Sequence, residues 1–164
     1  MGRKEEMFQY AREKLTPYIS ERANLLRKDC AAYLEMKREY HRIVSDLLQT
    51  AQKRQAAGTL GQIHYFSIFY LQSSAVTQSY DFALSLTNER YCLDQNGLLC
   101  FWCPQRLFQA VEEDLSFFEK DAIQMWIRIR PYELEEIRRA YINNLYQLAG
   151  FFFGLGYGIL QPLF

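Results

Sequence analysis

The 164-residue sequence predicts one α+β domain. We expect a long N-terminal helix, an antiparallel β-meander of three or four strands, and two C-terminal helices packed on the sheet. Three observations lead to this prediction. Residues 1–58 are basic with helical periodicity, residues 59–104 change to strand periodicity, and residues 105–164 return to helical periodicity. No linker rich in Pro, Ser or Gly separates these parts, so we expect a single domain over residues 1–164.

The charge balance and the aromatic content of the sequence indicate which partners to expect. The chain has 19 Lys and Arg against 19 Asp and Glu, so its formal net charge is zero. A balanced charge removes the electrostatic basis for a nucleic-acid partner, which we therefore do not expect. Aromatic residues reach 16%, which indicates large buried or interfacial side chains.

The N-terminal part predicts two helices of unequal length. The first covers residues 3–15. Thr16 and Pro17 then have the chemistry of an N-cap and a first helical residue, and no proline or glycine follows until Gly58. The apolar positions of this second helix alternate in steps of four and three, as in a heptad stripe. The stripe comprises Leu26, Cys30, Tyr33, Lys37, Tyr40, Val44, Leu47 and Ala51.

This second helix is too long for the domain that carries it. Roughly 40 residues at 1.5 Å each make a helix of about 60 Å, whereas a compact chain of this size has a radius of gyration of about 15 Å. Either the helix bends onto its own domain, or its stripe meets a partner. We favour a homodimer, because a two-fold axis covers one stripe with another. The interface candidates are Leu26, Tyr33, Tyr40, Val44 and Leu47.

The middle part predicts the strands. Residues 63–71 and 79–86 are rich in aromatic and branched side chains. Residues 89–93 and 98–103 flank Asp94-Gln95-Asn96-Gly97, which is typical of a hairpin. A two-residue turn at Asn96-Gly97 would place Cys92 opposite Phe101, and a four-residue turn with a bulge would place it opposite Cys100.

The last part predicts two helices and an apolar tail. Pro104 opens the first helix and Pro131 opens the second. Residues 125–130 alternate like a strand, but we favour helix because no turn precedes them. The apolar run 148–160 is shorter than the roughly 20 residues that span a membrane, so we favour a core or interface role over membrane contact.

Few residues indicate chemistry. Cys100 and Cys103 form a C-x-x-C motif, but in a strand residues three apart point to opposite faces, so we expect no metal and no redox pair. His41 and His64 have no nucleophile at a known motif spacing. The acidic run 112–114 suits the start of a helix. We assign no catalytic residue, no metal ligand and no cofactor.

Two functional hypotheses follow. The first is a non-enzymatic protein-interaction or scaffolding module that self-associates through the long helix. The few cysteines and the charged N-terminus favour a cytoplasmic location. The alternative is a small-molecule-binding protein or enzyme with an aromatic pocket between sheet and helices. The pocket candidates are His64, Tyr65, Tyr70, Tyr80 and Trp102.

Overall fold

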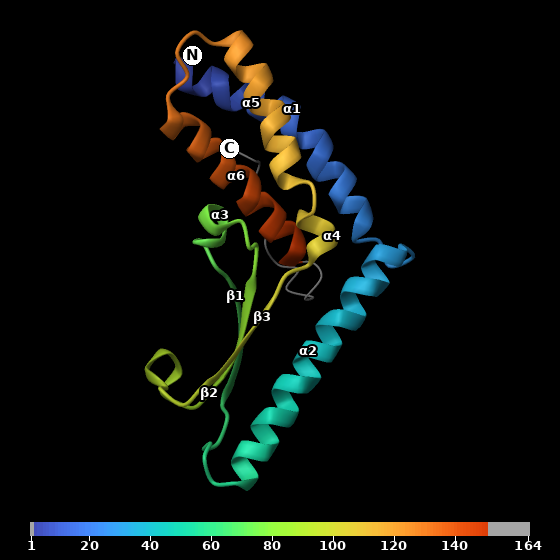
Figure 1. Cartoon of the computed structure of the whole chain (residues 1–164), viewed down its shortest axis with the longest axis vertical. Helices are drawn as coiled ribbons and strands as arrows, with labels where there is room; N and C mark the ends of the chain where they lie inside the picture. Colours follow the sequence, from blue (N-terminus) through green and yellow to red (C-terminus); the bar gives the residue numbers. More distant parts are fainter. Residues whose placement is uncertain (1, 151–164) are drawn as a thin grey trace. The chain divides into compact units, whose positions relative to one another are not determined.

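A computed structural model, which describes residues 2–150, confirms the α+β class (Figure 1). The element order is α1 Arg3–Leu25, α2 Ala31–Ala56, β1 Tyr65–Tyr70, α3 Ser74–Thr77, β2 Phe82–Thr87, the 3-10 turn η1 Tyr91–Leu93, β3 Leu98–Trp102, α4 Gln105–Phe108, α5 Val111–Met125 and α6 Pro131–Gly150. The chain divides into two compact units. The helical unit comprises the residues up to Leu34 and those from Gln105 onward, and the sheet unit comprises Glu35–Pro104. Folding as a single domain stays a prediction.

The helical unit is a bundle of α1, α5 and α6. Figure 1 shows α1 and α6 running in the same direction, and Lys4 near the start of α1 meets Glu136 near the start of α6 at 2.7 Å. Lys14 of α1 meets Asp121 late in α5, and Arg22, later in α1, meets Asp114 early in α5, so α5 runs back along α1. Each helix turns an apolar stripe inward. The buried side chains include Met7, Ala11 and Leu15 of α1, Leu115, Phe118 and Ala122 of α5, and Ile137, Tyr141 and Leu145 of α6.

The predicted boundary between the first two helices is wrong. α1 continues through Pro17 to Leu25, and the chain breaks at residues 26–30 instead. Proline removes one backbone hydrogen bond, but Leu15 and Arg22 on either side of it are buried, and their packing sustains the helix. The long helix expected over residues 17–57 is therefore two helices, and Leu26 precedes α2.

The sheet unit contains a three-stranded antiparallel sheet in the order β1-β2-β3, counted over the described residues. The strand predicted over residues 89–93 is wrong. That segment forms η1 inside a long loop between β2 and β3. Asp94 organises this loop, because its carboxylate accepts hydrogen bonds from the backbone N–H groups of Asn88 and Asn96, at 2.8 and 3.0 Å. Cys92 is exposed in the loop, so neither predicted hairpin register occurs.

Two further expectations in the C-terminal part need correction. The helix expected from Pro104 is divided into α4 and α5, and residues 126–130 form a turn rather than a continued helix. Glu133 stabilises that turn by accepting a hydrogen bond from the backbone N–H of Arg130 at 2.8 Å. From residue 151 onward, the apolar tail lies outside the described residues.

Candidate interaction surface

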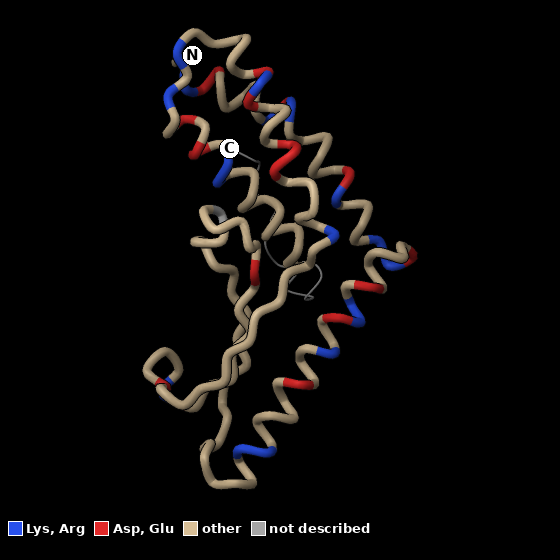
Figure 2. The backbone as a smooth tube through the Cα atoms, viewed as in Figure 1, with Lys and Arg blue, Asp and Glu red and all other residues tan. Residues whose placement is uncertain are grey.

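The sheet carries no charged side chain on any of its three strands. The sequence between Thr59 and Tyr80 contains no Lys, Arg, Asp or Glu, and β2 and β3 are also free of them. In Figure 2 the strands are tan along their whole length, whereas the helices carry frequent red and blue segments. Among residues 2–150, β1 and β3 each pair only with β2, so within this part of the chain both are edge strands.

The register sorts the strand residues onto two faces. Ser67, Ser85 and Leu99 form one row across the three strands. Phe69, Ala83 and Phe101 form a second row. These residues and Tyr65 therefore share one face, called here the Tyr65 face. Its large side chains are exposed: Tyr65 46%, Phe69 42%, Leu99 54% and Phe101 51%. Between them lie the small, buried Ala83 and Ser85 of β2. The result is an apolar surface with a floor of small residues.

The opposite face, called the Trp102 face, is covered at least in part by α2. The Tyr40 ring of α2 packs against the Trp102 ring in a tilted arrangement, with ring centroids 5.3 Å apart. The Trp102 indole Nε1–H also donates a hydrogen bond to Glu39, at 3.3 Å. Trp102 and Phe82 beside it are buried. Phe82, Leu84 and Leu86 of β2 lie on this face and are buried, whereas the buried Ala83 and Ser85 lie on the Tyr65 face.

This arrangement uses much of the predicted helical stripe inside the sheet unit. Tyr40 contacts Trp102, and Leu47 and Ala51 on the same side of α2 are buried. Val44 and Tyr33 are half-buried, and Leu26 lies in the break before α2. Three of the stripe residues are thus in contact with another side chain or buried within the chain.

Strand β1 is the more exposed of the two edge strands. Its four aromatic residues, Tyr65, Phe66, Phe69 and Tyr70, are all exposed, and they project from both faces. Tyr91 of η1 approaches Tyr65 edge to face, with ring centroids 5.4 Å apart. In β3, by contrast, the two end residues Leu98 and Trp102 are buried.

The structure does not gather the predicted pocket residues around one cavity. Tyr65 and Tyr70 lie at opposite ends of β1 and on opposite faces. Trp102 is packed under Tyr40, and Tyr80 is buried just before β2. His64 precedes β1, where its backbone N–H donates to the carbonyl of Thr87.

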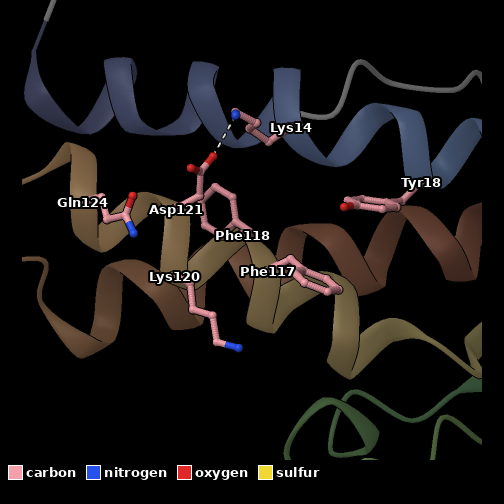
Figure 3. Close-up of a pocket in the computed structure, with 7 residues that line it drawn as sticks. All are labelled: Lys14, Tyr18, Phe117, Phe118, Lys120, Asp121 and Gln124. Atoms are coloured by element: carbon pink, nitrogen blue, oxygen red, sulfur yellow. Dashed lines mark ion pairs between the residues drawn. The ribbon is translucent and has the colours of Figure 1, made fainter.

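A groove lies elsewhere, in the helical unit between α1 and α5 (Figure 3). Its volume is about 330 Å³, and its polar centre is the ion pair between Lys14 and Asp121, at 2.7 Å. Tyr10 also donates a hydrogen bond to Asp121, at 2.5 Å. The hydrogen bonds from Lys14 and Tyr10 hold the pKa of Asp121 below its usual value. The groove's carboxylate is thus already satisfied by the protein, and we assign no ligand to it.

Sequence reasoning missed a buried polar cluster in the helical unit. Arg22 of α1 forms an ion pair with Asp114 of α5, and the Tyr141 hydroxyl of α6 donates to Asp114 at 2.6 Å. Arg22 also donates to the backbone carbonyls of Leu107 and Tyr18, at 3.1 and 3.2 Å. Burial raises the pKa of Asp114, while Tyr141 and Arg22 act in the opposite direction. The polar groups of the Arg22–Asp114–Tyr141 cluster bind one another and the backbone, so we assign the cluster a structural role.

The cysteines are free thiols in different environments. Cys92 is exposed, and Cys30, Cys100 and Cys103 are half-buried. Burial raises the pKa of Cys100, and burial together with the negative charges of Asp81 and Glu39 raises the pKa of Cys103 to about 12. A thiol with so high a pKa is a poor nucleophile at neutral pH.

The part of the chain that the structure describes shows neither a metal cluster nor a helix that could cross a membrane. Within residues 2–150, no group of three or more His, Cys, Asp or Glu side chains is placed to hold a metal ion. Over the same part of the chain, no helix combines the length and the apolar character that crossing a membrane requires. No protein-family model, curated protein or solved structure matches the chain.

Proposed function

We propose that this protein is a non-enzymatic interaction module that self-associates through its sheet. The observation that carries the proposal is the uncharged sheet with four large apolar side chains exposed on the Tyr65 face. Single exposed apolar residues are normal on soluble proteins, but a contiguous group indicates an interface. The partner that fits it is a second copy of this chain.

The sheet supports self-association better than the helical stripe does. Tyr40, Leu47 and Ala51 are used within the sheet unit, which leaves the half-buried Tyr33 and Val44 to a partner. The sheet offers larger exposed side chains, and it carries no charge that a second copy would repel. We therefore place the interface on the sheet and not on α2.

Sedimentation equilibrium over a range of protein concentrations tests the proposal. We expect the average mass of the wild type to rise from one chain to two. Phe69→Ser removes an exposed aromatic group of β1 and should weaken the dimer about tenfold or more. The matched control is Leu48→Ser, which removes a similarly exposed apolar group from α2 and should leave the mass unchanged. A wild type that stays monomeric at every concentration contradicts the proposal.

A further inference from the structure

We propose that the turn between α5 and α6 inserts into the surface of a membrane that contains anionic lipids. This segment, called here the α5–α6 turn, comprises residues 125–132, and Figure 1 shows it at one end of the helical unit, beside the start of α1. The inference rests on the exposed apolar side chains of the turn, on its arginines and on the small size of the contact it offers. No residue of the sheet takes part, so the inference does not depend on self-association.

The α5–α6 turn exposes several apolar side chains. Ile127 is the most exposed large apolar side chain of the described residues, at 87%. Met125 and Tyr132 on either side of it are also exposed. Trp126 is half-buried and meets Tyr10 edge to face, with ring centroids 4.8 Å apart. Aliphatic side chains at the tip with Trp and Tyr beside them are typical of protein segments that bind at the membrane interface.

Hydrogen bonds hold the turn in one conformation. Arg128 has a φ of +62°, in the left-handed region that few residues other than glycine adopt. The guanidinium of Arg3 in α1 donates to the carbonyl of Arg128, at 2.9 Å. The backbone N–H of Arg130 donates to the carboxylate of Glu133, at 2.8 Å. Because these contacts already fix the backbone beside Ile127, binding does not have to order the turn first.

The charges of the turn select a negatively charged surface. Residues 122–132 contain two arginines, Arg128 and Arg130, and no acidic residue. Neither guanidinium forms an ion pair with the part of the chain that the structure describes, and that of Arg130 donates to the hydroxyl of Tyr132 at 3.0 Å. Arginines beside an inserted apolar side chain can reach the lipid headgroups, and the negative potential of an anionic membrane attracts them.

The acidic side chains that follow the turn already have basic partners. Glu133 pairs with Arg3 at 3.4 Å, and Glu136 pairs with Lys4 at 2.7 Å. Two exposed acidic residues also begin α1 at this end of the helical unit: Glu5 and Glu6. We therefore place the attraction at the α5–α6 turn itself and not on the whole end of the bundle.

The size of the contact favours a lipid surface over a protein partner. A stable protein–protein interface takes about 20–30 residues from each side. The turn offers three exposed apolar side chains, those of Met125, Ile127 and Tyr132. Lipids need no complementary shape, because they close around the side chains that insert among them. The last described residue, Gly150, lies at the other end of α6, about 30 Å from the turn, since a helix rises 1.5 Å per residue.

Sedimentation of the full chain with lipid vesicles tests the inference. We expect the wild type to bind vesicles of phosphatidylcholine with about 30% phosphatidylserine, and to bind pure phosphatidylcholine about tenfold more weakly. Ile127→Ser removes the most exposed apolar group and should weaken binding about tenfold or more. The matched control is Leu93→Ser in η1, where the leucine is 79% exposed, and this variant should bind as the wild type does.

A second pair of variants tests the charge. Arg128→Gln removes a guanidinium that has no ion pair within residues 2–150, so its loss should leave the fold intact. We expect this variant to bind the anionic vesicles about fivefold more weakly, and with a smaller dependence on sodium chloride. Arg38→Gln, which removes an exposed arginine from α2, is the control and should change neither property.

The fluorescence of Trp126 supplies a readout that needs no change at the tip. The anionic vesicles should shift its emission to shorter wavelength as the ring enters the membrane interface. Trp102, the other tryptophan of the chain, is buried and should not respond. Trp126→Phe should therefore abolish the shift while binding persists. This measurement on the wild type decides the question even if Ile127→Ser fails to fold, which circular dichroism would reveal.

Three results would overturn the inference. A wild type that does not bind anionic vesicles leaves the turn without a lipid partner. Equal binding to both kinds of vesicle contradicts the role of the arginines. Undiminished binding by both Ile127→Ser and Arg128→Gln would place the membrane contact in another part of the chain. None of these results bears on self-association through the sheet, which sedimentation equilibrium tests without lipid.

Discussion

At the residue scale, the clearest stabilising feature is the Arg22–Asp114–Tyr141 cluster. It joins one residue from each of the three main helices of the helical unit. Arg22 and Asp114 are each 5% exposed, so neither charge has water as an alternative partner. A buried ion pair gains little over an apolar pair of the same volume, but removal of one partner leaves the other charge buried and uncompensated.

This geometry predicts unequal costs for two substitutions. Asp114→Ala leaves the Arg22 guanidinium without its counter-ion, and we expect the free energy of unfolding to fall by about 3–5 kcal/mol. Tyr141→Phe removes one hydrogen bond and leaves the ion pair, and we expect a loss of about 1–3 kcal/mol. Urea unfolding followed by circular dichroism measures both values. Equal costs would contradict this and show that the Arg22 charge is compensated without Asp114.

The thiols supply a second prediction at this scale. Only the thiolate reacts, so a thiol with a pKa of about 12 is ionised to about one part in ten thousand at pH 8. We expect the exposed Cys92 to react rapidly with Ellman's reagent and Cys103 to react slowly. Cys92→Ser should remove the fast phase and leave the slow one, and addition of denaturant should make all remaining thiols react. A fast phase that persists in Cys92→Ser would contradict this ordering.

At the element scale, local patterns predicted the type of most segments but not where each one ends. Residues 63–71 and 79–86 were predicted as strands, and β1 and β2 lie within or across those ranges. The predicted helix boundary at Thr16-Pro17 was wrong. These two residues suit the start of a helix, but they can also lie inside a helix when packing stabilises it. Packing of residues distant in sequence decides between these outcomes, and a local pattern does not contain that information.

The loop between β2 and β3 shows the same limit. Asp94-Gln95-Asn96-Gly97 is a strong hairpin signal, and β3 begins directly after it, but β2 ends already at Thr87. Asp94 binds backbone groups within the longer loop. At Gly97 a Cβ atom would lie 3.1 Å from the carbonyl oxygen of Leu86, so the glycine permits close approach of the two strands. The pattern identified the residues that shape the loop but not its length.

Asp94 makes the loop sensitive to pH. Hydrogen bonds from the backbone of Asn88, Asn96 and Gly97 lower the pKa of Asp94. A carboxylate with a lowered folded-state pKa contributes stability above its unfolded pKa of about 4, and this contribution is lost as the pH falls through the folded-state value. We therefore expect Asp94→Asn to flatten the decline in stability below about pH 4, measured by urea unfolding at several pH values. Glu89→Gln, an exposed change in the same loop, serves as the control and should leave the decline as it is in the wild type.

At the scale of the whole molecule, the sequence predicted the fold class, which the structure confirms. Self-association stays a prediction, and our proposal moves its interface from the helical stripe to the sheet. The over-long helix was the reason for choosing the stripe, and the break at residues 26–30 removes that reason. The uncharged middle of the chain was visible in the sequence. Its meaning depended on knowing which strands lie at the sheet edge and which side chains remain exposed, and both follow only from strand order and register.

If the interface carries no charge, the affinity of the dimer should depend little on salt concentration. Ion pairs across an interface weaken as salt screens them, with a Debye length of about 10 Å at 0.1 M and about 3 Å at 1 M. The three strands contribute no charged residue to the proposed interface on the sheet, and the chain has no net charge to repel a second copy. We therefore expect the dissociation constant of the dimer to change by less than about threefold between low salt and 1 M sodium chloride. Ammonium sulfate should tighten the dimer, because excluded salts strengthen apolar burial. Sedimentation equilibrium in the three buffers measures this. A dimer that dissociates as sodium chloride rises would place its contacts on the charged faces of the helices instead of on the sheet.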